Sequence, residues 1–582
     1  MILRYLTRRE WALVAACIAL IAAQVYLDLE IPGYMASITT VLTTGGGTSD
    51  VLAEGVPMLA CAFLSLLSSV AVGCMSSYVA TSLAKTLRKR QFDAVQSFSF
   101  EEIGRFSVSS LITRSTNDVN QIQMVVAMGL QVLVKAPIMA VWAVCKIVGS
   151  DLRWTSAVAL SVVVMLAVIV AIIRIVTPRF KKIQSMTDEV NRAIKEGIEG
   201  VRVVRAYNAE RYQEGRFEDA NRALTGTHLF ITRALAFMSP TMTTVMNLMS
   251  LSIYWIGASI VNDAVGFMRI EEFSSMVVFS AYALQIVASF MMLTAIFFIL
   301  PRAQVAARRV EEVITTEPSI KDGGSRESPE GHEGEIEFRN VGFAYPGTKE
   351  KVFGGVDLMV SKGETVAFVG ATGSGKSTIV SLVPRFYDAT EGQVLVDGKD
   401  VREYDLDYLR RKIAYVPQKA VLLSGTVEEN VNYGSTSESR GLDDVKRAVE
   451  VAQGKDFVES LEDGYGGRVA ENGTNFSGGQ KQRLSIARAV CRDPEIYIFD
   501  DSFSALDYKT DRDLRAALRR ATSDATLIIV AQRISTIRDA DRIVVLDQGR
   551  AVGIGRHEDL LRSCEVYREI AASQLTEEEA SL

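Results

Sequence analysis

Six long apolar runs dominate the first half of this 582-residue chain. The long ones match the roughly 20 residues that an α-helix needs to cross a bilayer. They begin at Trp11, Met58, Met124, Thr155, Met246 and Met276. Arginines precede the first run, as they would in a signal peptide, but more apolar runs follow and no clear cleavage site does. We therefore predict six membrane-spanning helices.

Lysine and arginine are distributed unevenly among the connections between these runs. The connection from Lys85 to Arg114 carries six of them, and the stretch from Arg179 to Arg233 is richer still, whereas the connection after the first run has none. Basic loops remain on the cytoplasmic side of a membrane. We therefore expect a multi-pass protein of the cell membrane with both long loops, both termini and its C-terminal half in the cytoplasm.

Charge and cysteine content narrow the function classes. A net charge of -6 argues against a nucleic-acid partner, because nucleic-acid binders are usually basic. The six cysteines form no CxxC pair, and four of them lie in apolar segments. We interpret them as small buried hydrophobic residues rather than as a disulfide framework or a zinc site.

The composition changes sharply near the middle of the chain. Residues 315–334 are polar and rich in Gly, Ser, Pro and Glu, which is typical of a domain boundary. After them, short strands alternate with helices, which indicates an α/β domain. We predict an α-helical membrane domain over residues 1–314, whose six helices extend into the cytoplasm, a linker over 315–334, and a nucleotide-binding domain over 335–582.

A phosphate-binding loop opens this second domain. The stretch "GATGSGKST" fits the P-loop pattern, with a strand before it and a helix after it. Its glycines allow successive backbone N–H groups to point into one concavity, Lys376 would reach the β and γ phosphates, and Ser377 would offer a hydroxyl to Mg²⁺. The predicted ATP-binding residues are Gly370, Thr372, Gly373, Ser374, Gly375, Lys376, Ser377 and Thr378.

Two further motifs accompany the P-loop. The strand in "EIYIFDD" ends at Asp500, a carboxylate suited to hold the water shell of Mg²⁺. The stretch "NFSGGQKQR" places a serine and two glycines before a basic helix, which is a second anion-binding helix start. One nucleotide does not need two such cradles from one domain, so we infer that the second faces another molecule's nucleotide.

Six spans followed by this set of motifs resemble a half-transporter of the ABC exporter type, over nearly the whole chain. The resemblance implies a dimer that binds two ATP molecules, each between one chain's P-loop and the other chain's signature. It also implies that Tyr345 stacks on adenine and that Gln418 senses Mg²⁺ and the attacking water. The implied signature is Phe476, Ser477, Gly478, Gly479 and Gln480, and the implied D-loop is Ser504, Ala505, Leu506 and Asp507. The implied Mg²⁺ ligands are Ser377, Gln418 and Asp500. The stretches "RSTNDVNQIQ" and "VRAYNAERYQ" resemble the tips of the two cytoplasmic helix pairs.

This sequence departs from the family pattern at two catalytic positions. Where the family has a glutamate as general base, the chain has Asp501, which is one methylene shorter. A general base must lie within about 2.6–3.2 Å of the proton it takes. Where the family has a histidine, the apolar strand "LIIVA" leads into Gln532, whose amide can donate a hydrogen bond but cannot become a cation near neutral pH.

We therefore expect an ATP-driven exporter subunit with a hydrolytically impaired site of its own and a nearly intact signature. Such a chain resembles one half of an asymmetric heterodimer, whose partner would be a second half-transporter with Glu and His in its site. Small amphipathic or hydrophobic molecules are the expected cargo, and ATP and Mg²⁺ the expected ligands. The alternatives are neutral variation with catalysis retained, a homodimer with two slow sites, an exporter-fold siderophore importer, and a regulatory or channel role. The six spans exclude a soluble ABC ATPase.

The sequence alone does not decide the roles of two sets of residues in the spans. Met238, Met242, Met246 and Met249 follow helical spacing, which fits either a packing stripe or a pliable apolar wall for cargo. The cations Lys135, Lys146 and Arg174 lie in or near the spans, where they either mark a functional site or extend towards the membrane surface.

Overall fold

The computed structural model describes residues 2–147, 151–265, 268–348, 350–434 and 440–574. The chain divides into two compact units. Unit 1 contains Met1–Gln96 and Ser109–Thr316, and unit 2 contains Ser97–Val108 and Glu317–Leu582. Unit 2 therefore includes a short insertion from the N-terminal half of the sequence.

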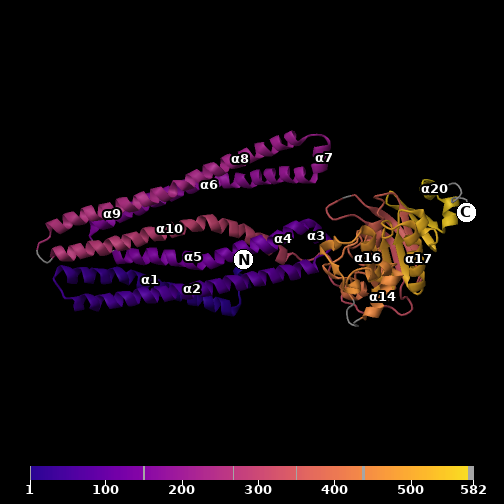
Figure 1. The fold of residues 1–582 in the computed structure, drawn as a ribbon, viewed down its shortest axis with the longest axis horizontal. Coiled ribbons are helices and arrows are strands. Elements are labelled where there is room, and N and C mark those ends of the chain that lie inside the picture. The colour runs from indigo at the N-terminus through magenta and orange to yellow at the C-terminus, as the bar shows by residue number, and fades with distance from the viewer. Residues whose placement is uncertain (1, 148–150, 266–267, 349, 435–439, 575–582) are drawn as a thin grey trace. The chain divides into compact units, whose positions relative to one another are not determined.

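Unit 1 is built from long helices that run alongside one another (Figure 1). Its helices are α1 (Arg8–Thr43), α2 (Thr48–Ser97), α4 (Val108–Thr113), α5 (Val119–Ile147), α6 (Leu152–Glu199), α7 (Val201–Ala206), α8 (Glu210–Ala236), α9 (Met238–Asp263) and α10 (Met268–Thr315), with η1 (Ile2–Tyr5) at the start. In the described residues, six stretches are long and apolar enough to cross a membrane by length and composition, which agrees with the six predicted spans. They are Arg8–Thr43, Thr48–Ser97, Val108–Ile147, Leu152–Arg179, Glu210–Asp263 and Met268–Leu293.

The tip of the first cytoplasmic helix pair differs from the prediction. The short helix α3 (Phe100–Phe106) lies upstream of "RSTNDVNQIQ", whose first residues instead form a π-helical turn, η2 (Arg114–Asp118), leading into α5. A capping box between Ser99 and Glu102 starts α3, and Ser107 with φ 58° ends it. The first predicted tip is therefore wrong, because these local signals break the chain earlier. In the second pair, α7 lies between α6 and α8, and only its last three residues fall in the predicted stretch, which begins at Val204.

The methionines of α9 lie inside the helix packing of unit 1. Met242 and Met249 are buried, and Met238 and Met246 pack against the same hydrophobic cluster. Their positions fit the interpretation as a packing stripe.

Two of the cations in the spans have acidic partners on another helix. Lys135 on α5 lies 3.2 Å from Asp28 on α1, and Lys146 lies 2.8 Å from Glu30. Ser65 on α2 also donates a hydrogen bond to Asp28. These pairs explain how charges are accommodated in an apolar environment, since a paired ion costs much less to desolvate than a lone one.

Unit 2 contains the sheets of the α/β domain. The six-stranded sheet has the order β12-β11-β3-β10-β9-β6, and only β12 is antiparallel to its neighbour. Its strands are β3 (Thr365–Gly370), β6 (Ile413–Val416), β9 (Ile496–Asp500), β10 (Thr526–Val530), β11 (Arg542–Asp547) and β12 (Arg550–Gly555). The antiparallel sheet has the order β2-β1-β4-β5, formed by β1 (Ile336–Phe343), β2 (Phe353–Val360), β4 (Glu391–Val396) and β5 (Lys399–Asp400). A third, two-stranded sheet pairs β7 (Gly425–Thr426) with β8 (Arg468–Val469).

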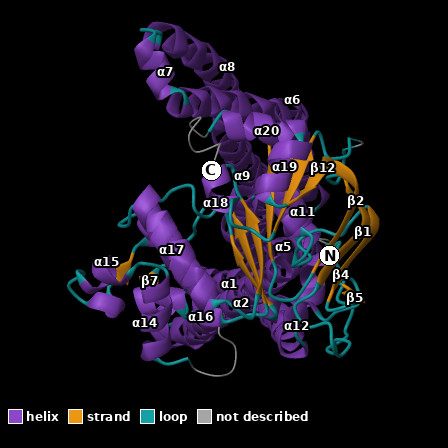
Figure 2. Ribbon diagram, turned by 90° about the vertical axis from the view of Figure 1, so that its right-hand side faces the viewer, coloured by secondary structure: helices purple, strands orange, loops and turns teal. Residues whose placement is uncertain are grey.

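Helices and the antiparallel sheet cover opposite faces of the six-stranded sheet (Figure 2). One hydrophobic cluster joins the large sheet to α14, α16 and α17, and the other joins it to β1, β2, β4 and α11. The helices of unit 2 are α11 (Lys376–Ser381), α12 (Leu406–Arg411), α13 (Val427–Val431), α14 (Leu442–Val451), α15 (Lys455–Glu459), α16 (Gly478–Arg492), α17 (Tyr508–Ala521), α18 (Ile534–Ile537), α19 (His557–Ser563) and α20 (Glu565–Ala572), with 3-10 turns at η3 (Gly464–Gly466) and η4 (Glu471–Gly473). A sheet covered on both faces explains why its strands are continuous apolar runs.

The ion pair between α1 and α5 leads to a stability prediction. Lys135→Met would leave Asp28 without its counterion, and we expect this to lower stability by about 1–3 kcal/mol. Asp28→Asn combined with Lys135→Met should recover at least half of that loss. Circular dichroism of full-length protein in one detergent would measure the thermal midpoints. A surface control is Lys195→Met, because the ion pair of Lys195 with Glu199 is largely exposed. This substitution should change the free energy of unfolding by less than about 0.5 kcal/mol. A double variant no more stable than Lys135→Met would contradict the prediction.

Candidate nucleotide site

The ends of four parallel strands form one edge of the large sheet. β3 ends at Gly370, β9 at Asp500, β10 at Val530 and β6 at Val416. Val530 pairs in register with Phe368 and with Asp500, so the ends of these three strands lie at nearly the same level. Residues that follow the strands therefore converge at this edge, as is usual for ligand sites in parallel sheets.

The P-loop connects β3 to α11 in a conformation that only glycine accommodates well. Gly373 and Gly375 have φ 88° and 93°, in the left-handed region. A Cβ on Gly370 would lie 2.0 Å from the backbone oxygen of Leu546 on the adjacent strand. This backbone approach requires glycine at position 370.

Lys376 lies within the P-loop and is nearly buried. Its Nζ donates to the backbone oxygens of Gly370 and Ala371, at 2.9 and 2.7 Å, and to Ser374 Oγ at 3.4 Å. Burial lowers the pKa of this ammonium, while the charges of Asp501 and Asp500 oppose that change. The loop therefore surrounds the Lys376 ammonium with oxygen atoms. The ammonium can turn from these oxygens towards an incoming phosphate.

Ser377 and Asp500 form a pair that fits a magnesium ion. Ser377 Oγ donates to Asp500 Oδ1 at 2.7 Å, and Asp500 is only 5% exposed. A hydroxyl and a carboxylate held together beside a phosphate loop are oxygen ligands of the kind that Mg²⁺ prefers. The second oxygen of the carboxylate accepts a hydrogen bond from the hydroxyl of Tyr415, at 2.9 Å.

Asp501 lies beside the two residues that the sequence predicts to act with it. Its Oδ2 accepts hydrogen bonds from Gln532 Nε2 at 2.9 Å and from Gln418 Nε2 at 3.2 Å. Asp501 has φ 49°, and its backbone N–H donates to Val530 O at 2.9 Å. Burial is the main cause of a raised carboxyl pKa, the Gln418 hydrogen bond opposes it, and the charge of Asp500 adds to it.

Tyr345 lies next to the P-loop helix. Its hydroxyl is 2.9 Å from Thr378 Oγ1, and its ring meets Tyr387 edge-on with centroids 5.5 Å apart. The side chain remains 39% exposed, so the ring retains surface on which a base could stack.

The stretch predicted to be the signature lies at the start of α16. Ser477 caps this helix through a capping box with Gln480, while Phe476 is buried in the core of the domain. A Cβ on Gly479 would lie 3.2 Å from the backbone oxygen of Ala505, so the signature and the D-loop are adjacent within this chain. Asp507 ends the D-loop by capping α17. The hydrogen bonds of Ser477 are made with Gln480 in the first turn of α16 and not with the P-loop.

Two residues of the site were not predicted from the sequence. Tyr415 lies three residues before Gln418, but only the side-by-side placement of β6 and β9 brings its hydroxyl to Asp500. Gln574 accepts a hydrogen bond from the backbone N–H of Ile534 and donates one to the backbone oxygen of Gln532, at 2.9 and 2.8 Å. Nothing in the local sequence of Gln574 indicates that it fixes the turn after β10.

Comparison with known proteins assigns the family. Residues 14–289 match the family described as "ABC transporter transmembrane region", and residues 353–504 match the family described as "ABC transporter". An uncharacterized ABC transporter ATP-binding protein of Mycobacterium tuberculosis (strain ATCC 25618 / H37Rv) is 39% identical over 575 residues, which cover 98% of each chain. This chain therefore belongs to the ABC transporter family.

Two further comparisons define the type of transporter. An ATP-dependent lipid A-core flippase of Pseudomonas fluorescens (strain Pf0-1) is 32% identical over 507 residues, which cover 85% of this chain and 81% of the flippase. A bacterial Atm1-family ABC exporter with ATP bound superposes with a TM-score of 0.81 at 26% identity, covering 98% of this chain and 99% of that chain. The predicted fold class and family are confirmed: the chain is a half-transporter of the exporter type, with a multi-pass helical membrane domain fused to a C-terminal ABC ATPase domain.

The close backbone approach at Gly370 leads to a binding prediction. Gly370→Ala would force its Cβ against Leu546 O, and we expect a loss of about 1–3 kcal/mol of stability together with loss of the thermal stabilisation by ATP. Thermal unfolding with and without ATP and Mg²⁺ would measure both effects. Gly441→Ala is the control, because an added Cβ there meets nothing within 4 Å. An ATP-induced shift in Gly370→Ala equal to that of the unaltered protein would contradict the prediction.

Proposed function

We propose that this chain is one half of a heterodimeric, ATP-driven exporter, and that its own P-loop site binds ATP and Mg²⁺ but hydrolyses ATP slowly. The observation that carries the proposal is the hydrogen bonding of Asp501, whose Oδ2 accepts from two amides, those of Gln532 and Gln418. Neither amide can take a proton from the carboxylate or become a cation near neutral pH.

Two effects on catalysis at Asp501 oppose each other. The raised pKa makes the carboxylate a better proton acceptor near neutral pH. However, the side chain is one methylene shorter than glutamate, and two amide donors hold one of its oxygens. Reach and orientation decide the outcome, because a base that does not touch the attacking water forfeits the 10²–10⁴-fold that general-base catalysis typically contributes.

The remainder of the site supports nucleotide binding. Lys376 would turn from its loop oxygens to the phosphates, Tyr345 would stack on the base, and Ser377 with Asp500 would hold Mg²⁺, which would supply charge stabilisation to the phosphates. The side chains of Ser477 and Asp507 cap the N-termini of α16 and α17, which supports an intact signature and D-loop. A poor hydrolytic site beside a well-formed signature suits a chain that completes its partner's site.

The expected direction of transport is out of the cytoplasm. The distribution of basic residues supports a cytoplasmic ATPase domain and cytoplasmic termini. The likeness to a lipid A-core flippase supports an amphipathic or lipid-like substrate, while drugs and peptides share the same chemistry. ATP binding would close two ATPase domains and reorient the spans, and hydrolysis at the partner's P-loop would reset them. The rivals are a homodimer with two slow sites and an exporter-fold siderophore importer.

Restoring the family residues tests the impaired site. In the purified chain alone, Asp501→Glu combined with Gln532→His should raise the ATPase rate at least about tenfold, since the longer acid regains reach and the imidazole can carry charge. The matched control is Asp501→Glu combined with Gln532→Asn, which retains an amide. Robust turnover by the unaltered chain, reduced 100-fold or more by Asp501→Asn, would overturn the proposal.

Co-expression with a half-transporter that has Glu and His in its site tests the heterodimer. Replacing the partner's catalytic glutamate with glutamine should abolish the ATPase activity of the heterodimer. The fold-loss of ATPase rate caused by Asp501→Asn in this chain should be at least tenfold smaller. Ser477→Ala in this chain should reduce the rate about tenfold, because the signature would act on the partner's ATP. Equal losses from the two base substitutions would favour two equivalent sites instead.

A further inference from the structure

The carboxylate of Asp500 is held from both sides. Ser377 donates to Oδ1 at 2.7 Å and Tyr415 donates to Oδ2 at 2.9 Å, from two different elements. Asp500 ends β9 and Tyr415 lies on the neighbouring strand β6. The phenol is the donor in this hydrogen bond, because an ionised carboxylate has no proton to give.

The two hydroxyls have different relations to the metal. Ser377 belongs to the P-loop and is a predicted Mg²⁺ ligand, so its hydrogen bond to Asp500 would be exchanged when the ion arrives. Tyr415 contacts the other oxygen, and its bond can persist with the ion in place. A carboxylate with one oxygen fixed in this way keeps its second oxygen directed at Ser377 and the P-loop, which reduces the ordering cost of metal binding.

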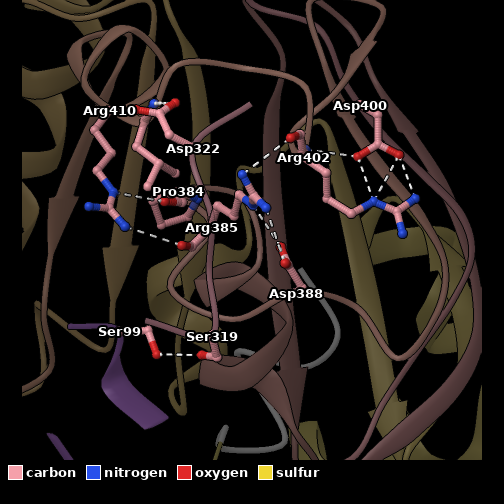
Figure 3. Close-up of polar contacts among 10 residues, drawn as sticks. Ser99, Ser319, Asp322, Pro384, Arg385, Asp388, Asp400, Arg402 and Arg410 are labelled. Carbon is pink, nitrogen blue, oxygen red and sulfur yellow. Dashed lines mark hydrogen bonds and ion pairs between the residues drawn. The ribbon is translucent and has the colours of Figure 1, made fainter. Parts of the chain in front are cut away.

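Tyr415 is itself held by an aromatic neighbour. Phe386 meets its ring edge-on, with centroids 5.2 Å apart. The loop that carries Phe386 is fixed by two arginines: Arg410 donates to the backbone oxygens of Pro384 and Arg385, both at 3.2 Å, and Arg385 pairs with Asp388 at 2.7 Å (Figure 3). Arg385 is 4% exposed and has φ 53°, so this turn has little freedom to rearrange.

The same phenylalanine contacts the short insertion of unit 2. The ring of Phe100, the first residue of α3, lies 4.9 Å from that of Phe386. This segment is anchored to the rest of unit 2 by Ser99, whose hydroxyl lies 2.8 Å from that of Ser319 (Figure 3). Glu102 also accepts a hydrogen bond from the backbone N–H of Ser319, at 3.1 Å. Ring contacts therefore link α3 through Phe386 to Tyr415, and a hydrogen bond links Tyr415 to Asp500.

We propose that Tyr415 is a positioning residue for the Mg²⁺ site: its hydroxyl orients Asp500, and its ring is seated by Phe386. In this role Tyr415 acts through the carboxylate that it contacts. The inference does not depend on whether this site hydrolyses ATP, because it concerns how tightly Mg²⁺ and nucleotide bind together.

Nucleotide affinity with and without the metal tests this role in the full-length protein. Equilibrium dialysis with a non-hydrolysable β,γ-imido analogue of ATP would give the Kd in Mg²⁺ and in EDTA, and the ratio of the two measures the coupling between metal and nucleotide. Tyr415→Phe keeps the ring and removes the hydroxyl, so the ratio should fall about tenfold while the Kd in EDTA stays within twofold. Phe386→Leu should lower the ratio by a smaller factor, about two to four.

Two further variants separate positioning from folding. Ser377→Ala removes a predicted metal ligand and should lower the ratio at least as much as Tyr415→Phe. Tyr404→Phe removes another buried phenol, which donates to Val396 O at 2.9 Å, and should leave the ratio unchanged. An unchanged or larger ratio in Tyr415→Phe, or the same fall in Tyr404→Phe, would overturn the inference.

Discussion

The hydrogen-bonded register of the parallel strands β3, β10, β9 and β6 is the constraint on which the nucleotide site depends. Parallel strands run in the same direction, so the residues that follow them meet at one edge of the sheet even when they are far apart in the sequence. This is how Gln418 and Gln532 reach the same oxygen of Asp501, and how the P-loop reaches Asp500. Helices and the antiparallel sheet pack against the two faces of the sheet that carries this edge.

Two consecutive carboxylates at this edge have opposite surroundings. Asp500 continues its strand and is held by hydroxyls, which can share it with a metal ion. Asp501 has a left-handed backbone and is held by amides, which cannot relay a proton. The hydroxyl partners of Asp500 suit a metal site, whereas the two amides that donate to Asp501 offer it no proton relay. This difference within one site is the physical basis for the proposed division of labour between two half-transporters.

In the helical unit, the cost of burying charge explains the pairing of two lysines with acidic residues. Lys135 and Lys146 would be expensive in an apolar environment if they were alone, and each is paired with an acid of α1. The methionines of α9 pack among the other apolar side chains of the bundle. The sequence left open whether these lysines extend towards the membrane surface or mark a site, because a pairing between helices cannot be deduced from spacing along one helix.

The sequence by itself determined the six apolar stretches, the change to an α/β domain and the P-loop, since each is a local pattern of residue types. The departures at Asp501 and Gln532 follow from comparison with the family pattern that the sequence resembles. The sequence did not reveal α3 at the first helix tip, although the Ser99 and Glu102 capping signal was present, because a seven-residue helix gives too little periodicity to recognise. Only the tertiary structure decided that two amides hold one oxygen of Asp501 and that Tyr415 holds Asp500. These partners come from separate strands and loops, and the pairing of strands, rather than any local preference, brings them within hydrogen-bonding distance.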